Sequence, residues 1–215
     1  MKNKIKAELK KINFVKTEDK SIGLYSEEYK DIFHSITGAL KESYDKFVNP
    51  ALSLNNKNQI NILDVCYGIG YNTKAMLNSC KSNINVDALE FNPLYIFLSP
   101  LVKDCIDNFD LKLFILEQIF INFQNCEEIC SIYKDILAKV NNEFFDENIK
   151  AFIEFLVNEL YKYTSLSLSQ GFLHNIYYFF VYFFIFTSVN YFCQVLFLIL
   201  LYFLKVRFWF NIYRC

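Results

Sequence analysis

The sequence predicts an α/β fold of the Rossmann-like type, because a strand, a glycine-bearing turn, a helix and a second strand follow one another along the chain. The expected elements are a strand over 60–65, a helix over 72–81 and a strand over 84–89. Gly68 and Gly70 stand in the turn, and Glu90 ends the second strand about twenty residues later. This spacing is typical of a βαβ unit that brings an acid to the ribose of a bound nucleotide.

The residue types in this unit suit a nucleoside site. Gly68 and Gly70 would let the backbone approach a ligand closely, and the helix that follows offers unpaired N–H groups. Glu90 would accept hydrogen bonds from both ribose hydroxyls of an adenosine. Asn72 and Thr73 stand at the start of the helix, where ligand contact and helix capping explain them equally well.

The glycine turn can be compared with the fingerprints of two cofactor classes. A dinucleotide fingerprint starting at Gly68 would put Thr73 where glycine or alanine belongs, so that match is incomplete. The acid-x-G-x-G-x-G turn of S-adenosylmethionine (SAM) methyltransferases fits better, with Asp64 as the acid and Cys66 in place of the first glycine. Cysteine is small enough for a tight turn, but it lacks the freedom of glycine to adopt positive φ.

Five motifs in residues 1–178 form a more specific set than the glycine turn alone. They are Leu-Tyr-Ser-Glu-Glu-Tyr at 24–29, His-Ser-x-x-Gly-Ala-Leu at 34–40, Leu-Asp-Val-Cys-Tyr-Gly-Ile-Gly-Tyr-Asn-Thr at 63–73, Ala-Leu-Glu-Phe-Asn at 88–92 and Gly-Phe-Leu-His-Asn-Ile-Tyr-Tyr at 171–178. This set resembles the methyltransferase domain of the MnmC-like family, the tRNA 5-methylaminomethyl-2-thiouridine biosynthesis proteins. The resemblance implies a class I SAM-methyltransferase fold and methylation of the aminomethyl group on the wobble uridine of certain tRNAs.

The same resemblance assigns roles to residues before the glycine turn. It implies that the segment 34–40 lies near the methionine end of SAM, with Ser35, Gly38 and Ala39 as cofactor contacts. Tyr25, Ser26 and Glu27 would line the substrate or cofactor entrance; alternatively, they cap and staple the helix that follows. The catalytic residues stay unknown, because the acid that the family uses falls in a segment that does not appear in this sequence.

Past Tyr178 the resemblance stops and the composition changes. All 23 acidic residues lie at or before Glu159, and residues 179–215 are rich in Phe, Tyr, Leu and Ile. One explanation is a transmembrane helix over 176–204, which exceeds the roughly 20 apolar residues that span a bilayer. The favoured explanation is a frameshift near codon 178. In either case we expect an incomplete methyltransferase domain, with a helical insertion and a hydrophobic C-terminal helical tail.

Charge and cysteine usage narrow the class of protein further. Residues 1–170 hold 19 Lys and Arg against 23 Asp and Glu, a net charge near −4, and the basic cluster lies at the N-terminus. That cluster could meet tRNA phosphates, although a solvated face explains it more simply.

The seven cysteines form no C-x-x-C pair, so we expect no metal site and a reducing, cytoplasmic compartment, with membrane association through the tail as the open alternative.

The chain divides into four parts by pattern. These are an N-terminal extension over 1–59 with a cofactor-facing segment, the βαβ nucleoside-binding unit over 60–92, a helical insertion over 93–170, and the last family-like motif running into the hydrophobic tail over 171–215. Within the first part, an extended segment over 21–31 leads into a helix over 33–47, and Asn49-Pro50 punctuates the approach to the first strand.

Three functions follow from these observations. The first is a SAM-dependent tRNA methyltransferase domain, truncated and of doubtful activity. The second is a catalytically silent SAM-binding protein or a tail-anchored membrane protein. The third, a nucleotide-cofactor oxidoreductase, is disfavoured by Thr73 in the third-glycine position.

Overall fold

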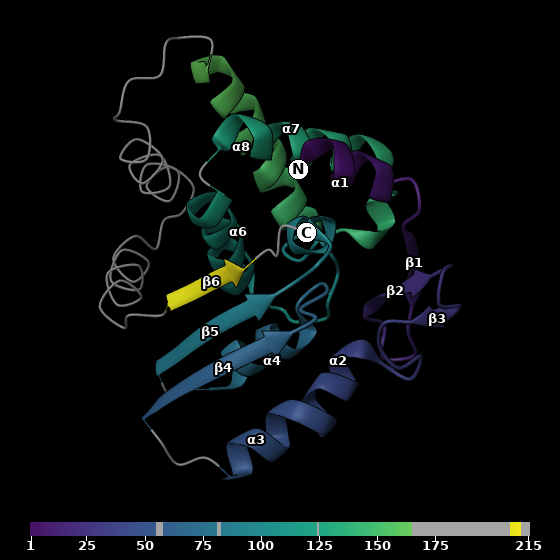
Figure 1. Cartoon of the computed structure of the whole chain (residues 1–215), viewed down its shortest axis with the longest axis vertical. Coiled ribbons are helices and arrows are strands. Elements are labelled where there is room, and N and C mark those ends of the chain that lie inside the picture. Colours follow the sequence, from purple (N-terminus) through teal and green to yellow (C-terminus); the bar gives the residue numbers. More distant parts are fainter. Residues whose placement is uncertain (55–57, 81–82, 124, 165–206, 212–215) are drawn as a thin grey trace.

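A parallel three-stranded sheet lies at the centre of the structure, a computed structural model that describes residues 1–54, 58–80, 83–123, 125–164 and 207–211 (Figure 1). Its strands are β4 (Gln59–Val65), β5 (Asn83–Leu89) and β6 (Arg207–Asn211), in the order β4-β5-β6. Both neighbouring pairs are parallel. The α/β class is therefore confirmed, and the order matches strands 1-2-3 of a doubly wound sheet.

The two faces of this sheet differ in burial. On one face Ile84, Val86 and Ala88 of β5 are buried. On the other face Leu63 and Val65 of β4 remain 64% and 58% exposed. Among the described residues β4 is an edge strand, so its outer hydrogen-bonding edge has no partner strand there.

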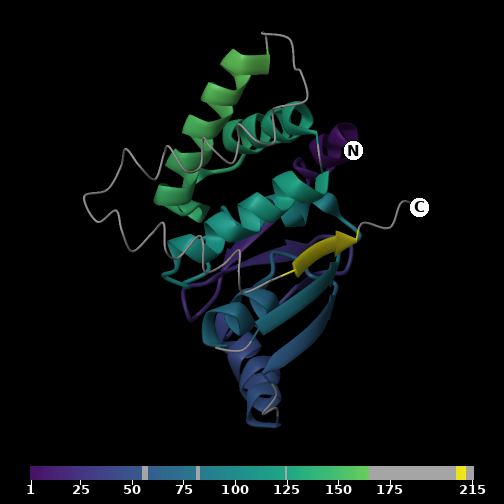
Figure 2. The same ribbon diagram turned by 90° about the vertical axis from the view of Figure 1, so that its left-hand side faces the viewer.

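Helices connect and cover the strands. Helix α4 (Tyr71–Ser79) makes the crossover between β4 and β5. Between β5 and β6 the described helices are α5 (Pro93–Leu98), α6 (Phe109–Phe123), α7 (Cys126–Lys139), the short 3₁₀ segment η2 (Asn142–Phe144) and α8 (Glu147–Thr164). Helices α6 to α8 gather at one end of the molecule (Figure 2), and their buried apolar side chains form much of the core.

An antiparallel sheet precedes the parallel one, in a region where the sequence analysis predicts only one extended segment. It consists of β1 (Asn13–Lys16), β2 (Ile22–Ser26) and β3 (Asp31–Ile32), and helix α1 (Lys2–Glu8) comes before it. The polar N-terminus folds because Ile5 and Leu9, spaced one helical turn apart, are buried in the core.

The helix predicted over 33–47 begins later and ends later. It runs through α2 (Ala39–Glu42), the π-helical segment η1 (Ser43–Val48) and α3 (Asn49–Leu54). It starts at Ala39 because the Asp19 carboxylate accepts from Lys41 N–H at 2.9 Å and so caps its first turn. Pro50 does not end it; this residue stands second in α3, directly after the π-helical segment.

The C-terminal tail is not helical throughout, since β6 extends the parallel sheet. Strand formation fits its composition, because Arg207–Asn211 reads Arg-Phe-Trp-Phe-Asn and aromatic residues favour strands. The transmembrane segment considered over 176–204 lies outside the described residues. Within the part of the chain that the structure describes, none of the helices is long and apolar enough to cross a bilayer.

Candidate nucleoside-binding site

A tight turn over residues 66–70 joins β4 to α4 at the carboxyl end of β4 (Figure 1). Tyr67 N–H donates to the Leu89 carbonyl at 3.0 Å, and Gly70 N–H donates to the Tyr67 carbonyl at 2.9 Å. The first bond holds the turn against the end of β5. Ligands of open α/β sheets bind outside the carboxyl ends of the strands, so this turn stands where a ligand is expected.

Glu90 lies directly against the glycine turn. Its Oε2 accepts from Gly68 N–H at 2.6 Å, and its Oε1 accepts from Asn92 N–H at 2.7 Å. The residue is only 7% exposed. A carboxylate offers about four acceptor positions, so each oxygen retains capacity for a second donor. The structure thus brings together two residues that the sequence analysis assigned to one ribose site.

Asp64 and Thr73 form a support beneath the turn. The Thr73 hydroxyl donates to Asp64 Oδ2 at 2.6 Å, and the two residues are 1% and 8% exposed, respectively. Burial raises the pKa of the Asp64 carboxyl, hydrogen bonds from Thr73 oppose this, and the nearby Glu90 charge adds to it. The pair fastens the end of β4 to the first turn of α4. Both side chains are therefore committed to holding the turn in shape.

Gly70 has a steric reason to be glycine. Its φ is +81°, and a Cβ built there would lie 2.3 Å from the Tyr67 hydroxyl oxygen. That hydroxyl is in turn 2.8 Å from Ser99 Oγ, deep in the core. Gly68, with φ of +59°, has open space instead, since the nearest atom to its Cβ position is the Cys66 carbonyl at 3.9 Å. Gly68 therefore leaves room for a ligand, whereas Gly70 accommodates Tyr67.

Cys66 adopts the left-handed conformation that the sequence analysis expected it to avoid, with φ of +61°. A non-glycine residue there carries a conformational cost of about 1–2 kcal/mol. Hydrogen bonds from the neighbouring residues of the turn outweigh that cost.

Replacing Cys66 with glycine should therefore stabilise the protein. We expect Cys66→Gly to raise the free energy of unfolding by about 0.5–1 kcal/mol, because relief of strain exceeds the extra entropy of glycine in the unfolded chain. Urea denaturation measures this change. Cys66→Ala is the control, since it removes the thiol and keeps the strain. A glycine variant no more stable than the alanine variant would contradict this interpretation.

Asn72 carries an unused polar atom beside the turn. Its Oδ1 is buried and has no hydrogen-bond partner among the described residues. Leaving a buried acceptor unpaired costs about 1–3 kcal/mol. A donor group on a ligand would remove that cost, which favours the ligand-contact role of Asn72 over the capping role.

Tyr71 is a residue that the sequence analysis did not single out. Its hydroxyl donates to the Ile22 carbonyl at 2.9 Å and accepts from Ile22 N–H at 3.0 Å, and its side chain is fully buried. It fastens the first turn of α4 to β2, and so joins the two sheets. Its position directly after Gly70 in the 63–73 motif is the signal that could have found it.

The segment 34–40 lies beside this junction. The His34 ring meets the Tyr71 ring edge-on at 5.3 Å between centroids. Burial lowers the pKa of His34, although the Glu42 carboxylate 3.4 Å away opposes that shift. Two of the predicted cofactor-contact residues donate their backbone N–H groups within the protein. Ser35 N–H donates to the Glu42 carboxylate at 2.8 Å, and Ala39 N–H donates to Ser21 Oγ at 3.1 Å.

Gly38 is held against Asp19, whose carboxylate oxygen would lie 2.3 Å from a Cβ at that position. Although partial burial raises the pKa of Asp19, hydrogen bonds from Ser21, Thr17 and Lys41 lower it below its usual range. Gly38 therefore shapes the cap of the helix that starts at Ala39. None of the contacts described for Ser35, Gly38 and Ala39 joins them to the glycine turn.

The predicted entrance residues belong to the antiparallel sheet. Tyr25 pairs with Ile32 across β2 and β3. Ser26 Oγ accepts from Tyr29 N–H at 3.3 Å, and Glu27 accepts from Asn13 at 2.9 Å. These bonds close the hairpins, so capping of the next helix is not their role. In the described part of the chain, no group of three or more His, Cys, Asp or Glu residues is placed to hold a metal ion.

The fold and the turn define an α/β protein with a parallel sheet and a βαβ unit. No family model matches the chain. An uncharacterized protein of Methanocaldococcus jannaschii, MJ0670, is 35% identical over 100 residues, which make up 46% of this chain. The match spans only 28% of that relative's length. A crystal structure of MnmC2 from Aquifex aeolicus is similar at 27% identity, over 50% of this chain and 37% of that chain, with a TM-score of 0.40.

Proposed function

We propose that this chain is a SAM-binding methyltransferase domain that acts in tRNA wobble-uridine modification. The observation that carries the proposal is the contact of Glu90 with Gly68 at the carboxyl ends of β4 and β5. It unites an acid suited to ribose hydroxyls with a turn suited to close backbone approach. The motif resemblance at 63–73 and 88–92 supports SAM over a dinucleotide.

The residues present fit an adenosine-bearing cofactor. Space is open beside Gly68, Glu90 retains acceptor capacity, and the buried Oδ1 of Asn72 has no partner among the described residues. When bound, SAM supplies a methyl group on a sulfonium centre. This chain would orient the adenosine through Glu90 and Asn72, and positioning would dominate catalysis of transfer to an amine.

A silent SAM-binding protein is the second candidate, and the edge position of β4 in the described part of the sheet favours it. Substrate pockets of doubly wound folds form where the strand order reverses, at the outer side of the first strand. Among the described residues that side of β4 carries no further strand. Binding of the cofactor without turnover would then be the whole activity of the chain.

Calorimetry with SAM and its demethylated product tests the cofactor assignment. We expect Glu90→Ala to weaken binding by about 1.5–3 kcal/mol, the usual contribution of hydrogen bonds to a charged acceptor. Asp87→Ala is the matched control, because Asp87 is an exposed acid on β5, three residues before Glu90. Equal binding by Glu90→Ala and the unmodified chain would rule out the ribose role. Heat released when NAD is titrated into the chain, with none released when SAM is titrated, would favour the oxidoreductase.

A further inference from the structure

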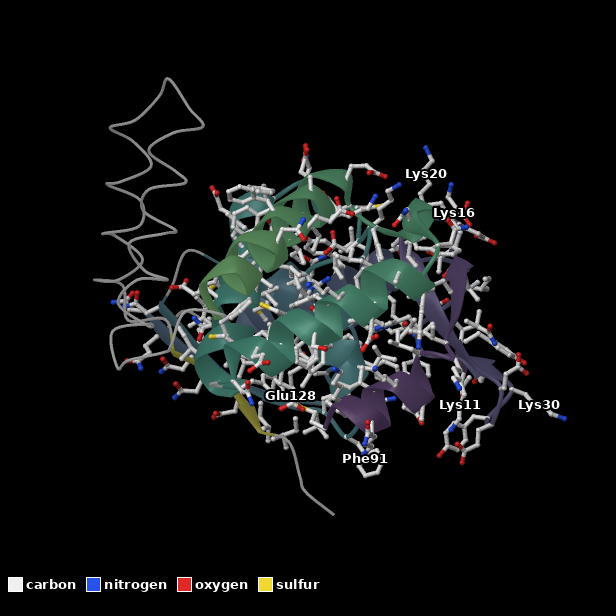
Figure 3. The ribbon with its side chains drawn as sticks, turned by 90° about the horizontal axis from the view of Figure 1, so that it is seen from above. Lys11, Lys16, Lys20, Lys30, Phe91 and Glu128 are labelled. Carbon is white, nitrogen blue, oxygen red and sulfur yellow. The ribbon has the colours of Figure 1, made fainter. Side chains whose placement is uncertain are left out.

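A cavity of about 650 Å³ lies away from the glycine turn. It is bounded by β1, the β1–β2 turn, the start of β2, the loop 103–107, α6 and the segment 143–146. Figure 3 shows Lys16 and Lys20 of its rim on one side of the molecule and Phe91, the neighbour of Glu90, on another. The lining residues are Lys16, Lys20, Ile22, Lys103, Asp104, Cys105, Ile106, Asp107, Lys112, Glu143, Phe144 and Asp146.

The inner wall is a chain of ion pairs whose charges cancel. Asp104 accepts from Lys74 at 2.7 Å and lies 3.3 Å from Lys112, whose ammonium is also 2.7 Å from Asp146. Although partial burial raises the pKa of Asp146, the Lys112 ammonium and two backbone N–H groups lower it below its usual range. Two cations therefore balance two carboxylates, and this wall attracts neither sign of charge strongly.

The rim is different, because three of its ammonium groups are uncommitted. Lys16, Lys20 and Lys103 come from three separate segments and form no ion pair with any described residue. Asp107 and Glu143 also line the cavity, and the Glu143 carboxylate accepts from Asn141 at 2.7 Å. The nearby Asp19 carboxylate is occupied by its own hydrogen-bond donors. The rim thus combines cations suited to phosphate with acceptors suited to amino groups.

An apolar surface completes the lining. Ile22, Ile106 and Phe144 contribute to it, and Phe144 is stacked on Phe14 with 4.8 Å between ring centroids. Aromatic side chains are the usual platforms for unpaired bases. Lys20 at the rim and Cys105 in the wall hold left-handed φ of +71° and +61°. Such strained positions concentrate at functional sites.

We propose that this cavity binds one nucleotide of an RNA strand, with its phosphate at Lys16, Lys20 and Lys103 and its base against Phe144. Ligand pockets typically measure roughly 300–1,000 Å³, so the volume suits a ligand of this size. The carboxylates of Asp107 and Glu143 would accept from base amino groups. The inference rests on the proposed function in one respect, the choice of RNA as the source of the nucleotide.

Fluorescence anisotropy of a labelled tRNA transcript tests the rim lysines in the full chain. We expect the triple variant Lys16→Gln/Lys20→Gln/Lys103→Gln to bind roughly tenfold more weakly or worse, and to reduce the slope of log affinity against log salt by about two. The matched control replaces Lys10, Lys30 and Lys139, three other exposed lysines, with glutamine. It removes the same charge, so equal losses in both triples would overturn the proposal.

Thiol footprinting locates the ligand and separates this proposal from the cofactor assignment. Cys105 is exposed in the cavity wall, and Cys66 is exposed in the glycine turn. Single-stranded RNA at about ten times its Kd should slow maleimide labelling of Cys105 about tenfold, by occupancy alone, and leave Cys66 unchanged. SAM should do the reverse. Protection of Cys66 by SAM with no protection of Cys105 by RNA would sink the cavity proposal and leave the proposed function intact.

Two further arms identify the source of the ligand. Protection of Cys105 by RNA and by a nucleoside monophosphate, but not by inorganic phosphate, supports recognition of a whole nucleotide. Protection by free nucleotides alone would overturn the choice of RNA. Protection by inorganic phosphate at the same concentration would overturn the role of the base and of Phe144.

Discussion

Asp104→Ala should lower the free energy of unfolding by about 3–5 kcal/mol, the range for breaking a buried ion pair by removing one partner. The Lys74 ammonium has no exposed surface and lies 2.7 Å from Asp104. Burial lowers the pKa of Lys74, and Asp104 opposes that shift. Without the carboxylate, Lys74 keeps the Ser99 carbonyl at 3.0 Å and the face of the Tyr71 ring 5.3 Å away, and neither is a counterion for its buried charge.

Urea denaturation followed by circular dichroism measures this loss. Asp107→Ala is the control, because Asp107 is exposed and lies three residues along the same loop. Surface changes of that kind usually stay within about 0.5 kcal/mol. The double variant Lys74→Met/Asp104→Ala should recover part of the loss, since it removes the unpaired cation together with the anion. A double variant that is less stable by the full sum of both single losses would refute the pairing.

Gly70→Ala should cost about 2–4 kcal/mol and abolish cofactor binding. The left-handed φ of +81° contributes about 1–2 kcal/mol of that loss. The remainder comes from the Tyr67 hydroxyl, which a methyl group at position 70 would push away from Ser99. Because the start of α4 and the turn N–H groups depend on this position, the cofactor site would move with it.

Gly68→Ala provides the comparison, because Gly68 shares the left-handed conformation and has no crowding atom within 3.9 Å. We expect it to cost only the conformational part, about 1–2 kcal/mol. Thermal unfolding of both variants, with and without SAM, separates strain from steric clash. The steric argument fails if the two alanine variants lose equal stability.

The βαβ unit was predictable because its signals are local. Apolar runs, a glycine pair and a terminal acid lie within about thirty residues, and the structure forms β4, α4 and β5 within two residues of the predicted bounds. The approach of Glu90 to Gly68 followed from the same spacing. The late start of the helix at Ala39 did not, since its cap comes from Asp19, which is 22 residues from Lys41.

The support of the site was less predictable for the same physical reason. Lys74 and Asp104 are 30 residues apart, and Tyr71 and Ile22 are 49 residues apart. No periodicity or motif of a single sequence encodes such pairs.

The conformation of Cys66 was unexpected for another reason, because the preference of its own side chain was weaker than the hydrogen bonds that fix the turn. The membrane segment considered over 176–204 stays a prediction, as does the frameshift.

The bond between Tyr71 and Ile22 also bears on how the chain is made. Translation proceeds from the N-terminus, so β2 is synthesised before α4. The amide and carbonyl of Ile22 therefore lack the Tyr71 hydroxyl until 49 further residues have been added. Ile22 N–H also donates to the Lys103 carbonyl at 3.2 Å, a partner made later still. Until then the nascent hairpin has only its own strand pairs to hold it, and an isolated hairpin is marginal in water. Native closure of the first thirty residues is therefore a late event of synthesis, set by residues near the middle of the chain.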